Sequence, residues 1–390
     1  MFSGKTTDTP AQQLCVERVT PSISKSDIIG AAIKKQLAIF LGWVKNNYWP
    51  VYCCSKISNL QSKIDMTYPR VLCLGEILFD CLADKPGVSL EEVESWTPYP
   101  GGAPANVACA LAKLGTAAGF IGAVGGDELG HSLVEVLQEV GVDTAGVQHH
   151  PSAPTRQVYV LRNEAGDRTF AGFGEFHTAD FADTHLLAAQ LPEVLFENAE
   201  FLVLGTLELA YPESREAIAR AIELAEKYDV KIILDINWRP VFWPNPDEAK
   251  AHIRKLLKKV DFIKLSEEEA EWLFDTTDPG AITYRLDSVE GVLVTAGEKG
   301  CAYCISENEG KIPAFKIDVE DTTGAGDSFL AGFVRQLCKV GIKSLADPEI
   351  TKKVVTYASA VGSMTAMKPG AIAAQPTAAE VEAFLYLYKN

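Results

Sequence analysis

The segment DTTGAGDSF, residues 321–329, places two glycines and an acid where a helix is expected to begin. Apolar residues follow at helical spacing, so the GAG triplet lies at the helix N-terminus and Asp327 lies in its first turn. The first amides of a helix lack internal acceptors and carry a partial positive charge, and glycine lets an anion approach them closely. The pattern therefore predicts an anion hole for a phosphate, with the Asp327 carboxylate beside it as a proton acceptor.

A purely structural explanation of this segment also exists, because acids favour helix N-termini and glycines form tight turns without any ligand. On this segment alone the two explanations have equal weight. A second segment, YPGGAPANVACALAKLG at residues 99–115, changes the balance. It puts a glycine pair before a helix that begins near Ala103 and carries Asn106 in its first turn.

Together the two segments resemble the signatures of the ribokinase or PfkB family of carbohydrate kinases. That family carries GG-x-x-x-N near its N-terminus and DTxGAGD near its C-terminus, and both occur here in that order. The stretches LGEILFD, GAVGGDELG, DFIKLSEEE and VTAGEKG also agree with the family. The resemblance covers about residues 70–376. It implies a ribokinase-like α/β fold, with a doubly wound, mostly parallel sheet, helices on both faces and a small β lid.

The resemblance also implies roles for the matching residues, with ATP and Mg²⁺ as co-substrates and a sugar hydroxyl as the phosphoryl acceptor. Asp327 is the expected base, beside the anion hole of Gly324, Ala325 and Gly326. The residues expected to contact the sugar are Asp80, Gly101, Gly102, Asn106 and Arg239. Those expected at the nucleotide are Ser266, Glu269, Thr295, Gly297 and Gly300, with Glu269 organising Mg²⁺ through water.

Two departures from the family pattern concern the ions. The N-x-x-E motif reads SEEE here, with Ser266 in place of Asn, although the hydroxyl still offers an oxygen to metal-bound water. Asp321 and Thr323 match the family's monovalent-cation site, but the later loop TAMKPGAIAA, residues 365–374, contains an inserted Pro369. Activation by K⁺ is therefore left open.

The stretch DINWRPVFW, residues 235–243, bears on the sugar, because it resembles both fructokinases and 2-keto-3-deoxygluconate kinases. Arg239 can hold a hydroxyl or a sugar carboxylate, or can simply pair with a surface acid. GGAPANVA resembles fructokinases more closely, so we expect phosphoryl transfer from ATP to fructose, giving fructose 6-phosphate. The alternatives are a 2-keto-3-deoxygluconate kinase or another PfkB sugar kinase, and a fructokinase-like scaffold without catalysis.

Short apolar runs alternate with helical patterns from residue 70 onward. The expected strands are VLCLGEI, AGFIGAVG, EFLVLGTL, VKIILDIN, VDFIKLS and GVLVTAG, and the expected helices span residues 103–114, 128–140, 212–228 and 247–259. Continuous apolar strands separated by helices imply a parallel sheet covered on both faces. AFKIDVE, residues 314–320, is strand-like and is expected to lead into the Asp327 helix.

Two segments, about residues 80–100 and 154–175, show strand-like alternation without a crossover helix. They predict the lid, with a turn at 163–167 in the second segment. Its edge strands favour pairing with a second copy, so a homodimer through the lid is one option, and the oligomeric state is left open.

The composition limits the classes of binding partner and the cellular compartment that are expected. The chain has 390 residues, 47% of them hydrophobic and 23% charged, and its net charge of −16 disfavours nucleic acid and anionic lipid as partners. Its nine cysteines lack the spacing of a disulfide framework, which favours the cytoplasm. Cys301 and Cys304 are expected in a buried strand, and His149 and His150 in a solvated loop, so no metal site is expected from them.

Residues 1–65 differ from the rest and are expected to form an extension of a kinase domain at 66–390. They hold eight Lys and Arg against four Asp and Glu, a net charge of +4, whereas the remaining 28 basic and 48 acidic residues give −20. Apolar residues at helical spacing between Ile28 and Val44 predict an amphipathic helix. The apolar run there is too short to span a membrane.

Overall fold

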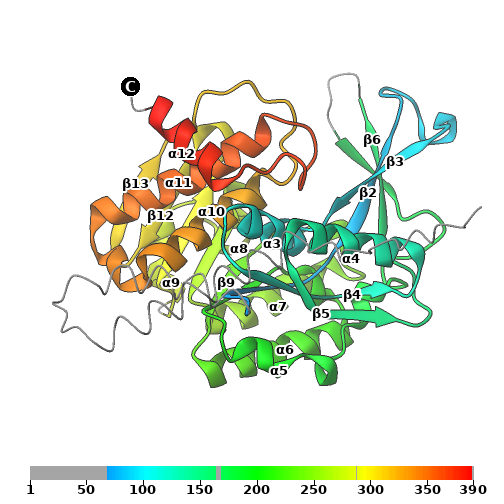
Figure 1. Ribbon diagram of the computed structural model, residues 1–390, viewed down its shortest axis with the longest axis horizontal. Helices are drawn as coiled ribbons and strands as arrows, with labels where there is room; N and C mark the ends of the chain where they lie inside the picture. Colours follow the sequence, from blue (N-terminus) through cyan, green and yellow to red (C-terminus); the bar gives the residue numbers. More distant parts are fainter. Residues whose placement is uncertain (1–67, 164–167, 287, 389–390) are drawn as a thin grey trace, which may run out of the picture. The chain divides into compact units, whose positions relative to one another are not determined.

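The computed structural model describes residues 68–163, 168–286 and 288–388, whose arrangement is shown in Figure 1. Nine strands of these residues form one sheet, in the order β13-β12-β11-β10-β9-β8-β1-β4-β5. The strands from β11 to β5 are parallel, and β12 and β13 add an antiparallel edge. The strands are β1 Val71–Leu74, β4 Ala118–Gly125, β5 Asp143–His150, β8 Phe201–Leu204, β9 Lys231–Asp235, β10 Phe262–Ser266, β11 Gly291–Thr295, β12 Cys301–Ile305 and β13 Asn308–Ile312.

Helices cover both faces of this sheet, because its central strands are apolar on both sides. In β1, Val71 and Cys73 face one hydrophobic core, while Leu72 and Leu74 face the other. The first core is completed by α3 (Ala103–Lys113), α4 (Glu128–Val140), α10 (Ala325–Val340), α11 (Pro348–Ala366) and α12 (Ala378–Leu387). The second is completed by α5 (Glu193–Phe196), α6 (Pro212–Tyr228), α7 (Ala249–Leu256), α8 (Glu267–Phe274) and α9 (Pro279–Leu286). The predicted doubly wound α/β fold is confirmed.

A second, four-stranded sheet stands apart from the main one in Figure 1 and forms the predicted lid. Its order is β3-β2-β6-β7, with β2 parallel to β6 and antiparallel to β3. The strands are β2 Leu78–Ala83, β3 Trp96–Gly101, β6 Gln157–Arg162 and β7 Arg168–Gly172. The Trp96 and Tyr159 rings pack edge to face across the sheet, with centroids 5.0 Å apart. Most of the turn predicted at 163–167 lies outside the described residues.

Two local predictions are wrong. Residues 314–320 form no strand, since β13 ends at Ile312 and the chain then runs without a neighbouring strand to pair with. His149 and His150 lie at the end of β5, an edge strand, and not in a loop. The helix predicted over 247–259 is α7, flanked by short 3-10 turns at Pro246–Glu248 and Leu257–Lys259.

Cys301 and Cys304 lie in β12 and are buried, as predicted. In the described part of the chain no helix is both long and apolar enough to cross a membrane. The predicted extension at 1–65, its boundary and its amphipathic helix lie outside the described residues and stay predictions.

Candidate active site

The site forms at the carboxyl ends of neighbouring parallel strands, where α/β sheets commonly bind ligands. β9 ends at Asp235, β10 at Ser266 and β11 at Thr295, and these strands pair in parallel. The first turn of α10 adjoins this edge, since a Cβ on Gly326 would lie 3.0 Å from Lys264 Nζ of β10, and α3 packs against α10. The fold thereby gathers segments that are far apart in the sequence.

The N-terminus of α10 has the conformation that its glycines were predicted to allow. Gly324 is the N-cap residue with a φ of 72°, and a Cβ there would lie 2.9 Å from the Ala371 side chain. The Ala325 amide donates to the Thr322 carbonyl at 3.2 Å. In the described part of the chain, no acceptor pairs with the amides of Gly326 and Asp327 and no side chain caps the helix. Two donors therefore remain for an anion.

Asp327 is held from across the site by α3. Its Oδ2 accepts a hydrogen bond of 2.8 Å from Asn106 Nδ2, and the Asn106 side chain is itself buried. Asn106 Oδ1 has no partner among the described residues and can accept from a substrate hydroxyl. The pKa of Asp327 is raised overall, by burial first and then by the nearby charge of Asp235, although Lys264 and the Asn106 bond partly offset the rise.

Beneath Asp327 lies an ion pair whose lysine was not predicted as a site residue. Lys264 of β10 donates to both carboxylate oxygens of Asp235 in β9, at 2.9 and 3.1 Å, and both side chains are buried. A Cβ on Gly326 would come within 3.0 Å of Lys264 Nζ. Because Gly326 has no side chain, the Lys264 ammonium group can lie directly against the first turn of α10. A lysine inside the otherwise apolar run DFIKLS was the available sequence signal.

On the lid side, predicted sugar and cation residues line a common cavity of about 70 Å³. Its walls include Asp80 of β2, Tyr99 of β3 and Arg162 of β6, facing Asp321, Thr323 and the 369–371 loop. Gly101 is adjacent, since a Cβ there would lie 2.8 Å from Asp80 Oδ2. The Asp321 carboxylate accepts hydrogen bonds from the Thr323 amide at 3.0 Å and from the Gly370 amide at 2.9 Å. It therefore connects the segment that precedes α10 to the 369–371 loop.

Gly102 is the N-cap of α3, and a Cβ there would collide with the Glu76 carbonyl at 2.5 Å. Below it lie two buried acids that the sequence reasoning did not identify, Glu76 and Glu208. Glu76 Oε1 accepts from the Ala103 amide at 2.8 Å, whereas Glu76 Oε2 and both Glu208 oxygens have no partner among the described residues. Burial raises the pKa of Glu76 to about 7 and that of Glu208 well above its usual range.

On the nucleotide side, Ser266 and Glu269 form a capping box at the start of α8. Glu269 Oε2 accepts from the Ser266 amide at 2.8 Å, and Oε1 accepts from the Trp238 amide at 2.7 Å. Both oxygens of this largely buried carboxylate thus accept a hydrogen bond from a backbone amide. One lone pair on each oxygen is left for water. Burial raises the pKa of Glu269.

The other predicted nucleotide residues follow β11. Thr295 Oγ1 donates to the Leu265 carbonyl at 3.3 Å. Gly300 has a φ of 97°, and a Cβ there would lie 2.0 Å from the Ile312 carbonyl, so packing alone requires this glycine. Gly297 has a φ of 53° with open space on its side-chain face, which leaves room for a ligand.

Arg239 is exposed on the loop after β9 and makes no ion pair with any described residue. Its guanidinium donates to the Trp238 carbonyl at 3.1 Å, so the surface-acid pairing considered from the sequence does not form among these residues. Its positive charge lowers the pKa of Asp327.

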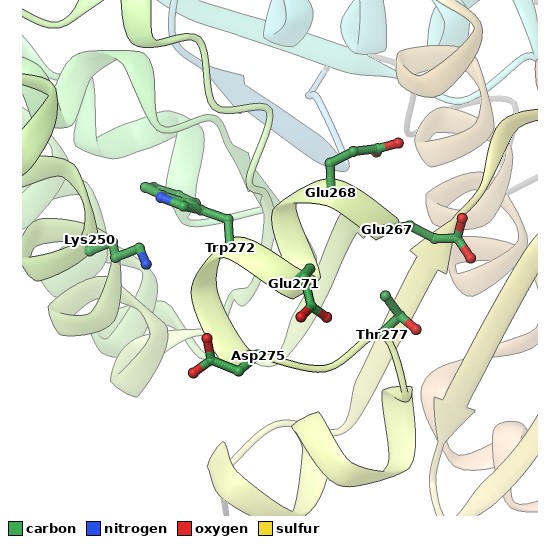
Figure 2. A pocket seen from close by; sticks show the side chains of 7 residues that line it. All are labelled: Lys250, Glu267, Glu268, Glu271, Trp272, Asp275 and Thr277. Carbon is green, nitrogen blue, oxygen red and sulfur yellow. The ribbon is translucent and has the colours of Figure 1, made fainter.

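A broad groove of about 720 Å³ lies on α7 and α8 and reaches the start of α8 (Figure 2). Its lining is Lys250, Glu267, Glu268, Glu271, Trp272, Asp275 and Thr277. Lys250 lies over the Trp272 ring, 5.2 Å from its centroid, and Trp272 stacks on Trp238 at 3.8 Å. Four carboxylates and one lysine make the groove unsuited to triphosphate.

Comparison with known proteins agrees with this geometry. The profile of the pfkB family carbohydrate kinases matches residues 69–378. The chain belongs to this family. It is 35% identical over 314 residues to Fructokinase-1 of Oryza sativa subsp. japonica, covering 80% of this chain and 96% of the relative.

Two solved structures of the pfkB-type fold are close to this chain. A fructokinase with bound ATP from Xylella fastidiosa has a TM-score of 0.74 at 28% identity, covering 82% of this chain and 99% of that one. A fructokinase double mutant from Vibrio cholerae O395, in fructose, ADP and potassium ion bound form, has a TM-score of 0.71 at 27% identity, with 81% and 98% covered. The predicted family and fold class are confirmed.

Proposed function

We propose that the chain is an ATP-dependent sugar kinase that converts fructose to fructose 6-phosphate. The observation that carries this proposal is the Asp327 carboxylate, fixed by Asn106 at 2.8 Å beside the unpaired amides of α10. The fructokinase relatives support fructose as the acceptor. Because donors for a phosphate and an acceptor for a proton occupy the same helix turn, the arrangement suits phosphoryl transfer to a hydroxyl.

The reaction follows from these positions. The sugar hydroxyl gives its proton to Asp327 while its oxygen forms a bond to the γ-phosphorus, and the bond between that phosphorus and the β-γ bridging oxygen breaks to release ADP. The amides of Gly326 and Asp327 stabilise negative charge on the transferring group. Asn106 orients the carboxylate through Nδ2 and accepts from the sugar through Oδ1.

Mg²⁺ would bind chiefly to the ATP phosphates and water, where it would neutralise charge on the transferring group. This fits the donor set, because in the described residues no three His, Cys, Asp or Glu side chains converge on one point. Glu269, with one lone pair left on each oxygen, is the side chain proposed to hold a metal-bound water. Asp321 and Thr323, beside the 369–371 loop, are the residues proposed for K⁺.

Arg239 favours one second candidate, phosphorylation of 2-keto-3-deoxygluconate. Its guanidinium has no acid partner among the described residues and can receive a sugar carboxylate bidentately. We propose coupled ADP-release assays with fructose, ribose, adenosine and 2-keto-3-deoxygluconate. The highest kcat/KM on fructose supports the first proposal, and the highest on the acid sugar supports the second. ATP binding without turnover on any of them leaves the scaffold alternative.

We further propose that the lid mediates a homodimer in the cytoplasm. Its outer strands β3 and β7 carry Tyr99 and Phe170, which are 44% and 40% exposed. The six described cysteines are all thiols, as a reducing compartment would keep them. Sedimentation of the wild type and of Phe170→Asp tests the dimer: we expect two chains for the first and one for the second, and a monomeric wild type contradicts it.

A further inference from the structure

A buried lysine occupies a position where an apolar residue would be expected. Lys264 is 7% exposed, and its register partner Asp235 in the neighbouring strand is 3% exposed. Their side chains meet at 2.9 and 3.1 Å. Removing two charges from water costs several kcal/mol for each ion, and a hydrophobic pair of similar volume is often equally stable or more so. Stability alone therefore does not explain this pair.

The pair also lies where a cation is electrostatically unfavourable. Phe262 of the same strand faces the core that contains α10, so Lys264, two residues later, points to the same side. Its Nζ lies 3.0 Å from the Cβ position of Gly326, in the first turn of α10. A helix N-terminus is already positive, and an ammonium group adds to that potential. Such a concentration of positive charge is stabilised only when anions adjoin it.

We propose that Lys264 is a charge-balancing residue of the active site, held by Asp235 behind the first turn of α10, where it attracts the nucleotide phosphate and favours the charged form of the Asp327 base. The inference rests on the proposed kinase function. Lys264 acts on Asp327 through space and is a positioning residue for the base. Asp235 fixes the ammonium group and partly offsets its charge.

The charged groups facing Asp327 come from several elements. They are Asp235 of β9, Arg239 of the loop after β9, Lys264 of β10 and Glu76 between β1 and β2, while Asn106 of α3 is neutral. Asp235 raises the pKa of Asp327, and Lys264 lowers it. Removing either member of the pair therefore leaves the opposite charge of the other acting alone on the base.

The test compares the acidic limb of the kcat/KM pH profile in two variants. In Lys264→Met the pKa of Asp327 rises, so the limb moves to higher pH and kcat/KM at neutral pH falls by about 10²-fold. In Asp235→Asn the limb moves to lower pH, because Glu269 and Asp327 continue to favour the charged form of Lys264. Lys231→Met is the matched control, since it removes a lysine ion pair at the start of β9 and leaves the limb in place.

Two further measurements decide the remaining outcomes. If Lys264→Met does not fold, the Asp235→Asn/Lys264→Met double variant carries no uncompensated charge, and its limb should return close to that of the wild type. ATP affinity by calorimetry, without sugar, should weaken in Lys264→Met and tighten in Asp235→Asn. Equal losses of activity with unmoved limbs overturn the inference and leave the kinase proposal intact. A wild type without turnover overturns the kinase proposal, and the ATP affinities then decide the inference.

Discussion

Two buried groups of acids lie on either side of the proposed sugar position, and they are stabilised differently. On the α10 side, Asp235 and Asp327 surround the ammonium group of Lys264, with Asp235 at 2.9 Å. On the α3 side, Glu76 and Glu208 form no ion pair with any described residue, since the nearby Arg156 already binds Asp183 through two hydrogen bonds of 2.6 and 2.8 Å. Buried carboxylates are thus paired with a lysine on the α10 side, whereas those on the α3 side are not paired with any described residue.

This contrast bears on which of the buried acids can act in their charged form. A buried carboxylate without a cation is stabilised by taking up a proton, whereas one beside a cation stays charged. Burial accordingly raises the pKa of Glu76 to about 7, and repulsion from Glu76 adds to the effect of burial on Glu208. Burial raises the pKa of Asp327 as well, but there Lys264 and the Asn106 bond oppose the rise, which suits the α10 side to accept a proton from substrate. The α3 side has no such ion pair among the described residues and supports the glycine turn above it.

The largest expected effect is on turnover when the ionised acid is lost. Asp327→Asn keeps the shape and the Asn106 contact region but removes the proton acceptor, so kcat should fall by roughly 10²- to 10⁴-fold with an unchanged melting temperature. Asp229→Asn is the matched control, because this exposed aspartate at the C-cap of α6 has a φ of 57° that asparagine tolerates. Near-normal turnover of purified Asp327→Asn would reject the assignment of the base.

A smaller effect is expected on stability when the proton-holding acids are neutralised. Glu76 has a folded-state pKa of about 7 against an ordinary value of 4.5, so its stabilising proton is present below pH 4.5 and is lost as pH rises through 7. Glu76→Gln should remove this dependence and raise the unfolding free energy above pH 7 by up to about 3 kcal/mol relative to the wild type. Denaturant titrations at pH 5 and 8 measure it.

Glu139→Gln on the exposed face of α4 is the control for that titration and should leave the pH dependence unchanged. If the unfolding free energy of Glu76→Gln has the same pH dependence as that of the wild type, the Glu76 carboxylate is not destabilised by its burial. The contrast between the two groups of acids would then fail.

The smallest effect concerns Glu269, whose two carboxylate oxygens accept hydrogen bonds from backbone amides. Ser266→Ala removes the hydroxyl that accepts from the Glu269 amide at 3.2 Å, and should lower the unfolding free energy by about 1 kcal/mol. Ser266→Asn retains a side-chain acceptor at the N-cap and should cost much less. Equal stability of all three proteins by chemical denaturation would show that this cap contributes nothing.

The sequence predicts local elements better than the contacts between them. The helices predicted at 128–140 and 212–228 match α4 and α6. Their apolar periodicity and their end signals depend only on residues that are close together in the sequence. Residues 314–320 have a strand-like pattern but no partner strand, and a strand requires pairing that the segment itself does not specify. Periodicity likewise did not place His149 and His150 in β5.

Within the site, the predicted residues meet where strands and helices converge, since Asn106 and Asp327 come into contact across 221 residues of sequence. The Lys264–Asp235 pair was missed because neither residue identifies its partner, and only strand register brings them together. Glu208 was missed because its neighbour Gly75, directly after β1, is distant from it in the sequence. The roles assigned to these residues stay predictions until they are tested.

The most direct test of the central claim is a crystal structure with a nonhydrolysable ATP analogue and fructose. We predict the terminal phosphate within hydrogen-bond distance of the Gly326 and Asp327 amides, and a fructose hydroxyl between that phosphate and Asp327. A terminal phosphate bound elsewhere, such as in the acidic groove of Figure 2, or a sugar whose hydroxyls all lie away from Asp327, would contradict the account.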